Sequence, residues 1–279
     1  MALASSGRSV FQPGTAIRAK IVFLLLGLAV ATLVPPASAG LSLSHQEALR
    51  IGRKVWQNEC GGSVAGLTSW NTGENFASLG IGHFIWYPAG VRGPFEESFP
   101  AFIRYVEKRG AKLPDLLLGR NGTDCPWNSR AEFLAAGSSA KMKNLQIFLV
   151  DTIDLQADFL VERLRAALPK MLQAAAPAER EKIEQRFNRL ANRAQGCYAL
   201  IDYVNFKGEG VLATERYEGR GWGLLQVLEG MSDESGASPV GEFADSAERV
   251  LRERVKKSPP ARNEKRWLEG WLRRVNSYH

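Results

Sequence analysis

Two glutamates, Glu59 and Glu74, lie in a polar, glycine-rich stretch whose residue types suit acid–base chemistry. A pair of carboxyl groups can cleave a glycosidic bond when one donates a proton to the leaving oxygen and the other stabilises positive charge or activates water. Ser78 carries a hydroxyl that could help to hold such a water. A carboxyl separation of ~6.5–9.5 Å would predict inversion, and ~5–5.5 Å would predict retention. The sequence is compatible with both.

A helix that ends beside Glu59 is expected to position this side chain. Ser44 followed by Glu47 has the pattern of a capping box and predicts where the helix begins. The paired glycines Gly61 and Gly62 predict where it ends. Glu59 then lies at the helix C-terminus, where the partial negative charge of the helix disfavours a carboxylate, and an ordinary solvated glutamate is the competing interpretation. Neighbouring aromatic residues are expected to surround it and favour the protonated acid; they are Trp56, Trp70, Phe76 and Phe84.

The N-terminus has the features of a secretory signal peptide. Arg18 and Lys20 precede an apolar run over residues 21–34, and Ala37-Ser38-Ala39 matches a small-residue cleavage pattern. The run is shorter than the ~20 apolar residues of a membrane span. We therefore expect a signal peptide over residues 1–39, cleavage after Ala39, and a periplasmic or secreted protein without a stable membrane span. An uncleaved anchor is the alternative.

The remaining 240 positions predict one mostly helical domain from residue 40 to residue 279. The composition, 45% hydrophobic and 23% charged, is ordinary for a globular protein. Residues 67–87 alternate Gly and Asn turns with short apolar pieces, which predicts a small hairpin or irregular sheet. Residues 143–172 form the longest periodic segment and are expected to be one central helix. We therefore expect a mainly α (α+β) fold with a small β-hairpin element near the N-terminal side of the mature chain.

The stretch from Glu59 to Ser78-Leu79-Gly80-Ile81-Gly82-His83 resembles the lysozyme-like superfamily, particularly phage-type lysozymes and endolysins. In that family a catalytic glutamate closes the first long helix, the hairpin carries a second acid, and a hydroxyl residue opens a TIGxGH-type strand. The resemblance implies a lysozyme-like helical domain that cleaves peptidoglycan or a related amino-sugar polymer. It implies Glu59 as general acid and Ser78 in place of the threonine. The hairpin aspartate is missing; Asn71 stands near its place, and Glu74 is the candidate substitute.

Two segments further along the chain are also similar to enzymes of this superfamily. Residues 200–210, LIDYVNFKGEG, resemble the FNxG-like turn of phage-type enzymes. Residues 217–227, YEGRGWGLLQV, resemble the GxGLMQV strand of goose-type lysozymes and lytic transglycosylases, which follows the catalytic glutamate. One alternative therefore makes Glu209 or Glu215 the acid. Another places Trp222 on the far wall of the cleft, and a third packs it into the core. A transglycosylase route needs a single glutamate, and the missing aspartate keeps that route open.

Sugar rings stack on aromatic faces, and glycan sites combine aromatic residues with a few fixed polar groups. Alternate residues of a strand face opposite sides, so at most one pair of the aromatic stretch 84–88 can face a cleft. His83 is expected to brace the hairpin by hydrogen bonds. The candidate substrate-binding residues are Asn71, His83, Trp86, Tyr87, Asn205, Glu209, Tyr217, Trp222 and Gln226.

The cysteines and the net charge indicate which disulfide, cofactors and partners are expected. Export permits a disulfide, and Cys60 with Cys125 is the favoured pair, whereas Cys197 is expected to be a buried thiol. No CxxC or paired-histidine spacing occurs, so we expect no metal and no cofactor. The formal charge is +7, and without the three cations of the first 39 residues it would be +4. This suits an anionic cell wall or a solvated surface, and the lack of a long basic run argues against nucleic acid.

Three classes of function therefore remain open. The first is an exported glycan-cleaving enzyme. The second is a catalytically inactive lysozyme-like protein that binds glycan or a wall-associated partner in the periplasm. The third is an unrelated helical interaction protein, and the oligomeric state is unknown in all three.

Overall fold

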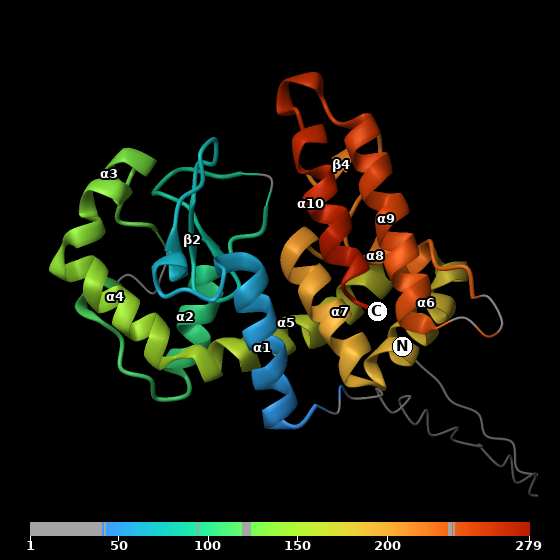
Figure 1. The fold of residues 1–279 in the computed structure, drawn as a ribbon, viewed down its shortest axis with the longest axis horizontal. Helices are drawn as coiled ribbons and strands as arrows, with labels where there is room; N and C mark the ends of the chain where they lie inside the picture. Colours follow the sequence, from blue (N-terminus) through green and yellow to red (C-terminus); the bar gives the residue numbers. More distant parts are fainter. Residues whose placement is uncertain (1–40, 42, 94, 119–123, 234–235, 237) are drawn as a thin grey trace, which may run out of the picture. The chain divides into compact units, whose positions relative to one another are not determined.

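The computed structural model describes residues 41, 43–93, 95–118, 124–233, 236 and 238–279, and these described residues belong to one compact unit (Figure 1). The expected signal peptide and its cleavage site lie outside the described residues. The fold is mainly helical with a small antiparallel sheet, as the sequence predicts. No described helix is long and apolar enough to cross a bilayer.

Helix α1 (His45–Cys60) begins and ends where the sequence predicts. The Ser44 hydroxyl accepts from the Glu47 amide at 3.3 Å, and the Glu47 carboxylate accepts from the Ser44 amide at 2.9 Å. Gly61 ends the helix in the left-handed conformation, with φ +60°, which glycine adopts without strain. The buried face of α1 packs against α5, so the last turn and Glu59 are held at a fixed place.

The predicted hairpin region is a three-stranded antiparallel sheet, β1 (Thr68–Ser69), β2 (Ala77–Leu79) and β3 (Phe84–Trp86), in the order β1-β2-β3. Ser78 pairs with Ser69 on one side and with Ile85 on the other. The turn 80–83 joins β2 to β3 and packs against α5 through a hydrogen bond from the Ile81 amide to Gln156 Oε1 at 2.8 Å. The sheet is therefore anchored to the helical core at this turn.

The segment 143–172 is not one helix, contrary to the prediction. It is divided between α4 (Ala140–Asp151) and α5 (Ile153–Ala174) at Thr152, which adopts φ −107° and ψ 15°. The Thr152 hydroxyl donates to the Phe148 carbonyl at 2.7 Å, and Gln156 Nε2 donates to the Leu149 carbonyl at 2.6 Å. The Phe148 carbonyl also keeps the helical bond from the Thr152 amide at 3.1 Å, whereas the Gln156 side chain satisfies the Leu149 carbonyl at the break. Ile147 and Val150, two apolar residues of this segment, are 58% and 37% exposed.

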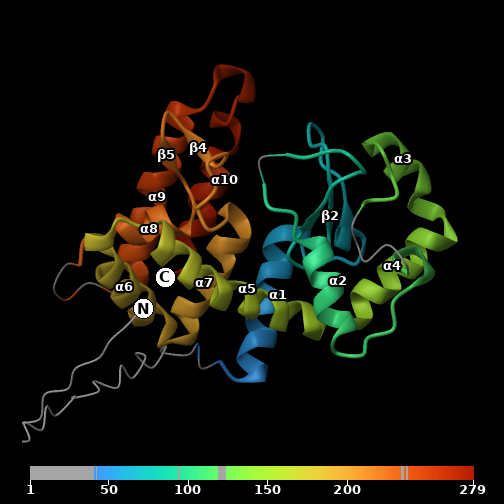
Figure 2. The ribbon, with the colours of Figure 1, turned by 180° about the vertical axis from the view of Figure 1, so that it is seen from behind.

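The remaining helices form two groups on α5. Figures 1 and 2 both show α5 running from the sheet with α2–α4 to the helices α6–α10. The helices are α2 (Phe99–Glu107), α3 (Arg130–Ala135), α6 (Arg180–Ala191), α7 (Ala194–Lys207), α8 (Leu224–Glu229), α9 (Pro239–Lys257) and α10 (Lys265–Asn276). Short 3₁₀ helices cover Ala65–Leu67, Asp115–Leu117, Ala136–Ser138, Pro177–Glu179 and Pro260–Arg262. A two-stranded ribbon, β4 (Arg216–Tyr217) with β5 (Arg220–Gly221), precedes α8.

Candidate functional site

A cleft of about 1320 Å³ collects residues from the sheet, from α1, α5 and α7, and from the C-terminal helices. Glu59, Glu74 and Ser78, the three residues expected to be catalytic, all line it. Five of the expected substrate-binding residues line it as well: Asn71, His83, Asn205, Glu209 and Trp222. The fold therefore brings together residues that are up to 163 positions apart, from Glu59 to Trp222.

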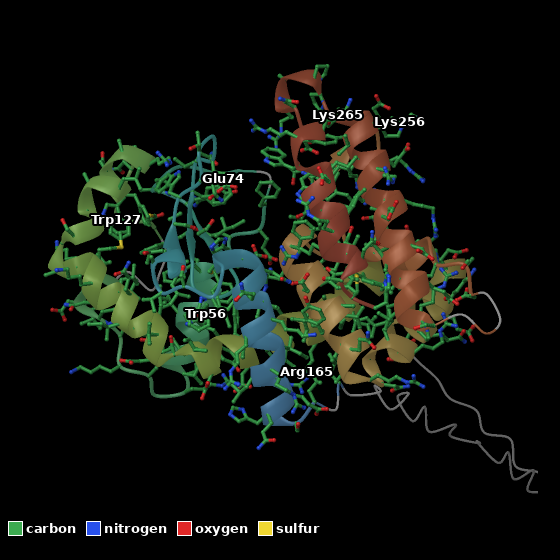
Figure 3. The ribbon with its side chains drawn as sticks, in the orientation of Figure 1. Trp56, Glu74, Trp127, Arg165, Lys256 and Lys265 are labelled. Carbon is green, nitrogen blue, oxygen red and sulfur yellow. The ribbon has the colours of Figure 1, made fainter. Side chains whose placement is uncertain are left out.

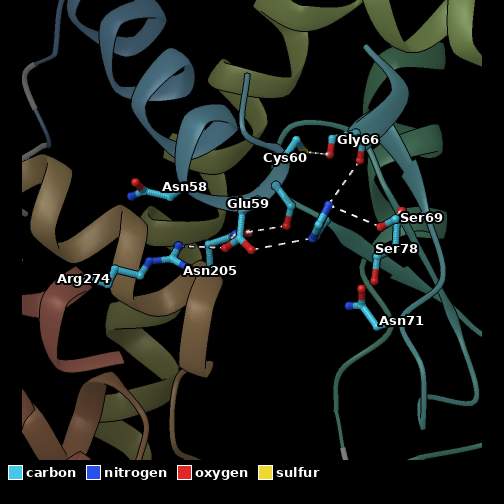
Figure 4. Close-up of polar contacts among 12 residues, drawn as sticks. Asn58, Glu59, Cys60, Gly66, Ser69, Asn71, Ser78, Asn205 and Arg274 are labelled. Carbon is cyan, nitrogen blue, oxygen red and sulfur yellow. Dashed lines mark hydrogen bonds and ion pairs between the residues drawn. The ribbon is translucent and has the colours of Figure 1, made fainter. Parts of the chain in front are cut away.

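Glu59 is held by charged and polar partners. Its Oε1 accepts from Arg274 Nη2 at 2.7 Å and from Asn205 Nδ2 at 3.3 Å, and its Oε2 lies 3.6 Å from His83 Nδ1 (Figure 4). The side chain is 15% exposed, so these contacts are partly shielded from water. Charge-assisted hydrogen bonds of this kind are stronger than neutral ones. The resting site therefore presents Glu59 as a hydrogen-bond acceptor.

This environment differs from the apolar one expected for Glu59. The Trp56 indole donates to the Ser63 carbonyl at 3.2 Å, and Trp70 packs against Phe133. The other two expected neighbours also have aromatic partners elsewhere, because Phe76 packs on Tyr87 and Phe95, and Phe84 on Phe102 and Phe159. Trp70 and Phe84 belong to the hydrophobic core, and Trp56 is partly buried against it, while Phe76 lines the cleft. The contacts of the glutamate are made by polar residues.

Arg274 is itself fixed by a buried carboxylate, Asp202 on α7. Arg274 Nε and Nη2 donate to the two Asp202 oxygens at 2.7 and 2.8 Å. Asp202 is fully buried and accepts two further hydrogen bonds, from the Tyr278 hydroxyl at 2.7 Å and from Asn58 Nδ2 at 3.1 Å. Burial opposes the charged form of Arg274, but the carboxylates of Glu59 and Asp202 outweigh it and raise the arginine pKa. Arg274 is therefore a permanent cation that joins α10 to the end of α1.

Asn205 and His83 link Glu59 to the turn between β2 and β3. Asn205 Nδ2 also donates to the Gly82 carbonyl at 3.0 Å, and its Oδ1 accepts from Arg163 at 3.1 Å. His83 Nε2 lies 3.2 Å from the Gly66 carbonyl and 3.4 Å from the Ser69 hydroxyl, so the histidine braces the hairpin as expected. These bonds fix the distance between the α1 terminus and the sheet.

The two glycines of the turn are required by its close contacts. Gly80 has φ +72°, and a Cβ placed there would lie 2.4 Å from the Gln156 side-chain oxygen. A Cβ on Gly82 would lie 2.7 Å from the Phe84 ring and 3.0 Å from Asn205. The Gly-Ile-Gly pattern is therefore explained by the packing of the turn against α5 and α7.

Glu74 and Asn71 stand on the loop between β1 and β2. Asn71 Nδ2 donates to Glu74 Oε2 at 3.1 Å, and the Trp70 indole donates to the Glu74 carbonyl at 2.8 Å. Burial raises the pKa of Glu74, the bond from Asn71 counteracts part of the rise, and the negative charge of Glu59 adds to it. Figure 4 shows Ser78 and Asn71 across from Glu59, on the side of the hairpin. Glu74 thus places a carboxyl group with a raised pKa on the hairpin, in the same cleft as the Arg274-paired Glu59.

Four expected substrate-binding residues do not line the cleft. Trp86 and Tyr87 are 0% and 1% exposed. Trp86, at the end of β3, packs on Phe99 and Trp127, and Tyr87, just after the strand, packs on Phe76. Figure 3 shows Trp127 close to α3, away from Glu74 on the hairpin. The Tyr217 hydroxyl donates to Glu264 at 2.8 Å. Gln226 binds backbone groups around the cleft loop, donating to the Gly210 carbonyl and accepting from the Gly223 amide.

Glu209 and Glu215, the alternative acids, both lie on the cleft wall. Glu209 accepts from Lys170 at 2.8 Å, and the same ammonium lies 3.7 Å from Glu96. Glu215 is 4% exposed, and its burial raises its pKa to about 7. The backbone hydrogen bond from Gly210 and the charge of Arg254 lower the pKa, but by less than burial raises it. Glu215 therefore keeps a proton close to neutral pH.

Comparisons of the chain with protein-family models, with curated proteins and with solved structures found no match. The lysozyme-like resemblance therefore rests on the Glu59–His83 motifs of the sequence. The geometry of the cleft is therefore the remaining guide to the function.

The expected disulfide between Cys60 and Cys125 does not form. The Cys60 thiol lies 3.5 Å from the Gly80 carbonyl at the turn end of β2. Cys125 instead lies beside the other end of β3, where its amide donates to the Tyr87 carbonyl at 2.9 Å. Cys197 is a buried thiol as predicted. Among the described residues no group of His, Cys, Asp and Glu is arranged to hold a metal ion.

Several residues in and behind the cleft were not predicted from the sequence. Arg274 bonds to Glu59 and Asp202 bonds to Arg274, yet Arg274 lies 215 positions after Glu59. The basic C-terminal segment was the available signal for Arg274, and it gives no partner. Trp267 and Trp271 also line the cleft, and their spacing of four residues on a helix was the available signal.

Proposed function

We propose that this protein cleaves glycosidic bonds in peptidoglycan or a related amino-sugar polymer, with Glu59 as general acid. The observation that carries the proposal is the convergence of Glu59, Glu74 and the 204–222 segment on one large cleft. A cleft of this volume, with aromatic residues and a few fixed polar groups, suits a polymeric sugar. The SLGIGH turn supports the same assignment by resemblance.

Proton donation requires a protonated carboxyl group that reaches the glycosidic oxygen, whereas Glu59 accepts a hydrogen bond from Arg274 in this structure. The proposed mechanism therefore includes a change at this contact when the sugar binds. Arg274 keeps two hydrogen bonds to Asp202 without Glu59, so the arginine remains satisfied when the glutamate turns toward the glycosidic oxygen. Glu74 then accepts a proton from a water held near Ser78, and the oxygen of this water adds to the anomeric carbon and completes hydrolysis. Without that water, a hydroxyl group of the sugar itself closes on the anomeric carbon, and the product is the anhydro end of transglycosylation.

The purified protein, without residues 1–39, is expected to clear a gel that contains cell-wall peptidoglycan. The reason is that the cleft carries both an acid and a second carboxyl group. Mass spectrometry of the products distinguishes reducing ends, which indicate hydrolysis, from anhydro ends, which indicate transglycosylation. Protein that pellets with the wall but clears nothing at several pH values would contradict the enzyme and support the inactive glycan-binding protein.

A second candidate for the acid is Glu215, because burial raises its pKa to about 7. The charged form is disfavoured in the folded state, so the fold loses stability as the pH rises from about 4.5 to about 7 and the loss is complete above this range. We expect Glu215→Gln to be more stable than the unchanged protein at pH 8, by up to about 3 kcal/mol, and the difference to vanish near pH 4. Urea unfolding at both pH values measures it.

The matched control is Glu107→Gln, since Glu107 is exposed at the end of α2. The control should change the unfolding free energy equally at the two pH values. An identical result for Glu215→Gln would contradict its buried, protonated state. Loss of wall clearing in Glu215→Gln, together with retained clearing in Glu59→Gln, would transfer the role of acid to Glu215.

A further inference from the structure

An aromatic and cationic patch on α10 and on the 3₁₀ helix before it lines part of the cleft, and it is here called the α10 patch: Arg262, Arg266, Trp267 and Trp271. All four residues line the same cleft as Glu59. Trp267 and Trp271 stack at 6.0 Å with 28° between their planes, as their spacing of four residues on α10 allows. The patch therefore shares its cleft with the proposed catalytic site.

The two indoles differ in how much of each ring is available. The Lys207 ammonium lies 3.3 Å from the centre of the Trp271 ring, and the edge of Phe206 packs on the same residue. Trp267 is 40% exposed, an unusual state for the largest apolar side chain. Trp271 is thus a fixed support. The exposed 40% of Trp267, beside the Arg266 guanidinium that lies over its ring, is the surface that a sugar ring can reach.

The two arginines add positive charge that the protein does not neutralise. The Arg266 guanidinium lies 4.3 Å over the Trp267 ring, a position that leaves its N–H edge available for a ligand. Among the described residues no carboxylate pairs with Arg266. Arg262 lies 3.8 Å from Glu264, but that carboxylate is already bound by Arg254 in two hydrogen bonds. The patch therefore presents donors for an anion beside an exposed indole.

We infer that the α10 patch is a subsite for an acidic sugar, and that the strand lying in the cleft carries carboxylate groups. Trp267 stacks on the sugar ring while Arg262 and Arg266 bind the carboxylate. An uncharged chitin-like strand could stack on the indole but has no carboxylate for the two arginines. This inference rests on the proposed function in that the occupant is a glycan strand. It narrows the substrate class from amino-sugar polymers in general to acidic ones.

Isothermal titration calorimetry on the Glu59→Gln protein tests the inference without cleavage of the ligand. The probes are soluble peptidoglycan strands freed of peptide, the same strands with their carboxyl groups amidated, and inorganic polyphosphate. We expect Arg262→Gln with Arg266→Gln to lower the affinity for the carboxylate strands about tenfold and to leave the amidated strands unchanged. Trp267→Ala should lower the affinity for both strands about tenfold, and Trp267→Phe should restore much of it.

The matched control is Lys265→Gln with Arg273→Gln. It also removes two positive charges, from positions of α10 that do not line the cleft. It should change the affinity less than about twofold, because exposed charges away from the ligand contribute little. An equal loss in the control, or polyphosphate binding as tightly as the carboxylate strands, would overturn the subsite. Strand binding that neither cleft variant weakens overturns the inference alone, whereas no strand binding at all overturns the proposed function as well.

Discussion

Glu59→Gln is expected to reduce wall clearing by at least about a hundredfold, the usual contribution of a general acid. Glutamine keeps the shape of the side chain and can still accept from Arg274 and Asn205, but it cannot donate a proton to a leaving oxygen. The free energy of unfolding should change by less than about 1 kcal/mol, because Arg274 keeps both hydrogen bonds to the buried Asp202. Clearing assays and urea unfolding on the same preparation measure the two effects.

Glu96→Gln is the control, since Glu96 lines the same cleft but is 52% exposed and lies 3.7 Å from Lys170. It should retain clearing. Clearing by Glu59→Gln at the rate of the unchanged protein would remove Glu59 from the mechanism. Glu74→Gln then distinguishes the routes, because a two-carboxylate hydrolase needs Glu74 and a single-glutamate transglycosylase does not.

Asp202→Asn is expected to lower the free energy of unfolding by about 3–5 kcal/mol, the usual cost of removing one partner from a buried ion pair. Asp202 is fully buried and accepts four hydrogen bonds, from Asn58, from two nitrogens of Arg274 and from Tyr278. An asparagine would direct its own N–H groups at these donors and leave the arginine with Glu59 as its remaining carboxylate. The result would be a loosened contact between α1, α7 and α10.

Urea unfolding checks this value against Asp245→Asn, a change of the same chemistry at an exposed position of α9. The control should stay within about 0.5 kcal/mol of the unchanged protein. A loss below about 1 kcal/mol in Asp202→Asn would mean that the buried network contributes little to stability. The support that it gives to Arg274 beside Glu59 would then also be in doubt.

The side of the sheet that Trp86 faces and the helix break at Thr152 could not be predicted from the sequence. Alternation along β3 correctly limited which aromatic residues can face a cleft, but it could not decide which side of a small sheet is the core. Helical periodicity continued through Thr152, since apolar residues recur at the same spacing on both sides of it. The helix breaks there because Gln156 bonds to the Leu149 carbonyl and to the amide of Ile81, which lies 75 positions earlier.

The sequence by itself determined the local features of the site. Ser44 and Glu47 begin α1, Gly61 ends it, and Gly80 with Gly82 permits a turn that packs closely on its neighbours. These features follow from backbone conformations and hydrogen bonds between residues a few positions apart, which a pattern of residue types can encode. They place Glu59 at a helix end facing a hairpin.

Only the tertiary structure decided the chemical state of the residues so placed. Arg274 reaches Glu59 across 215 positions, Asp202 fixes Arg274, and burial raises the pKa of Glu74 and Glu215. Charge pairing and desolvation depend on which distant side chains share a volume, and a linear pattern does not contain that information. The α10 patch joined the cleft for the same reason, because the packing of α9, α10 and α7 brings Trp267 to the cleft that Glu59 lines.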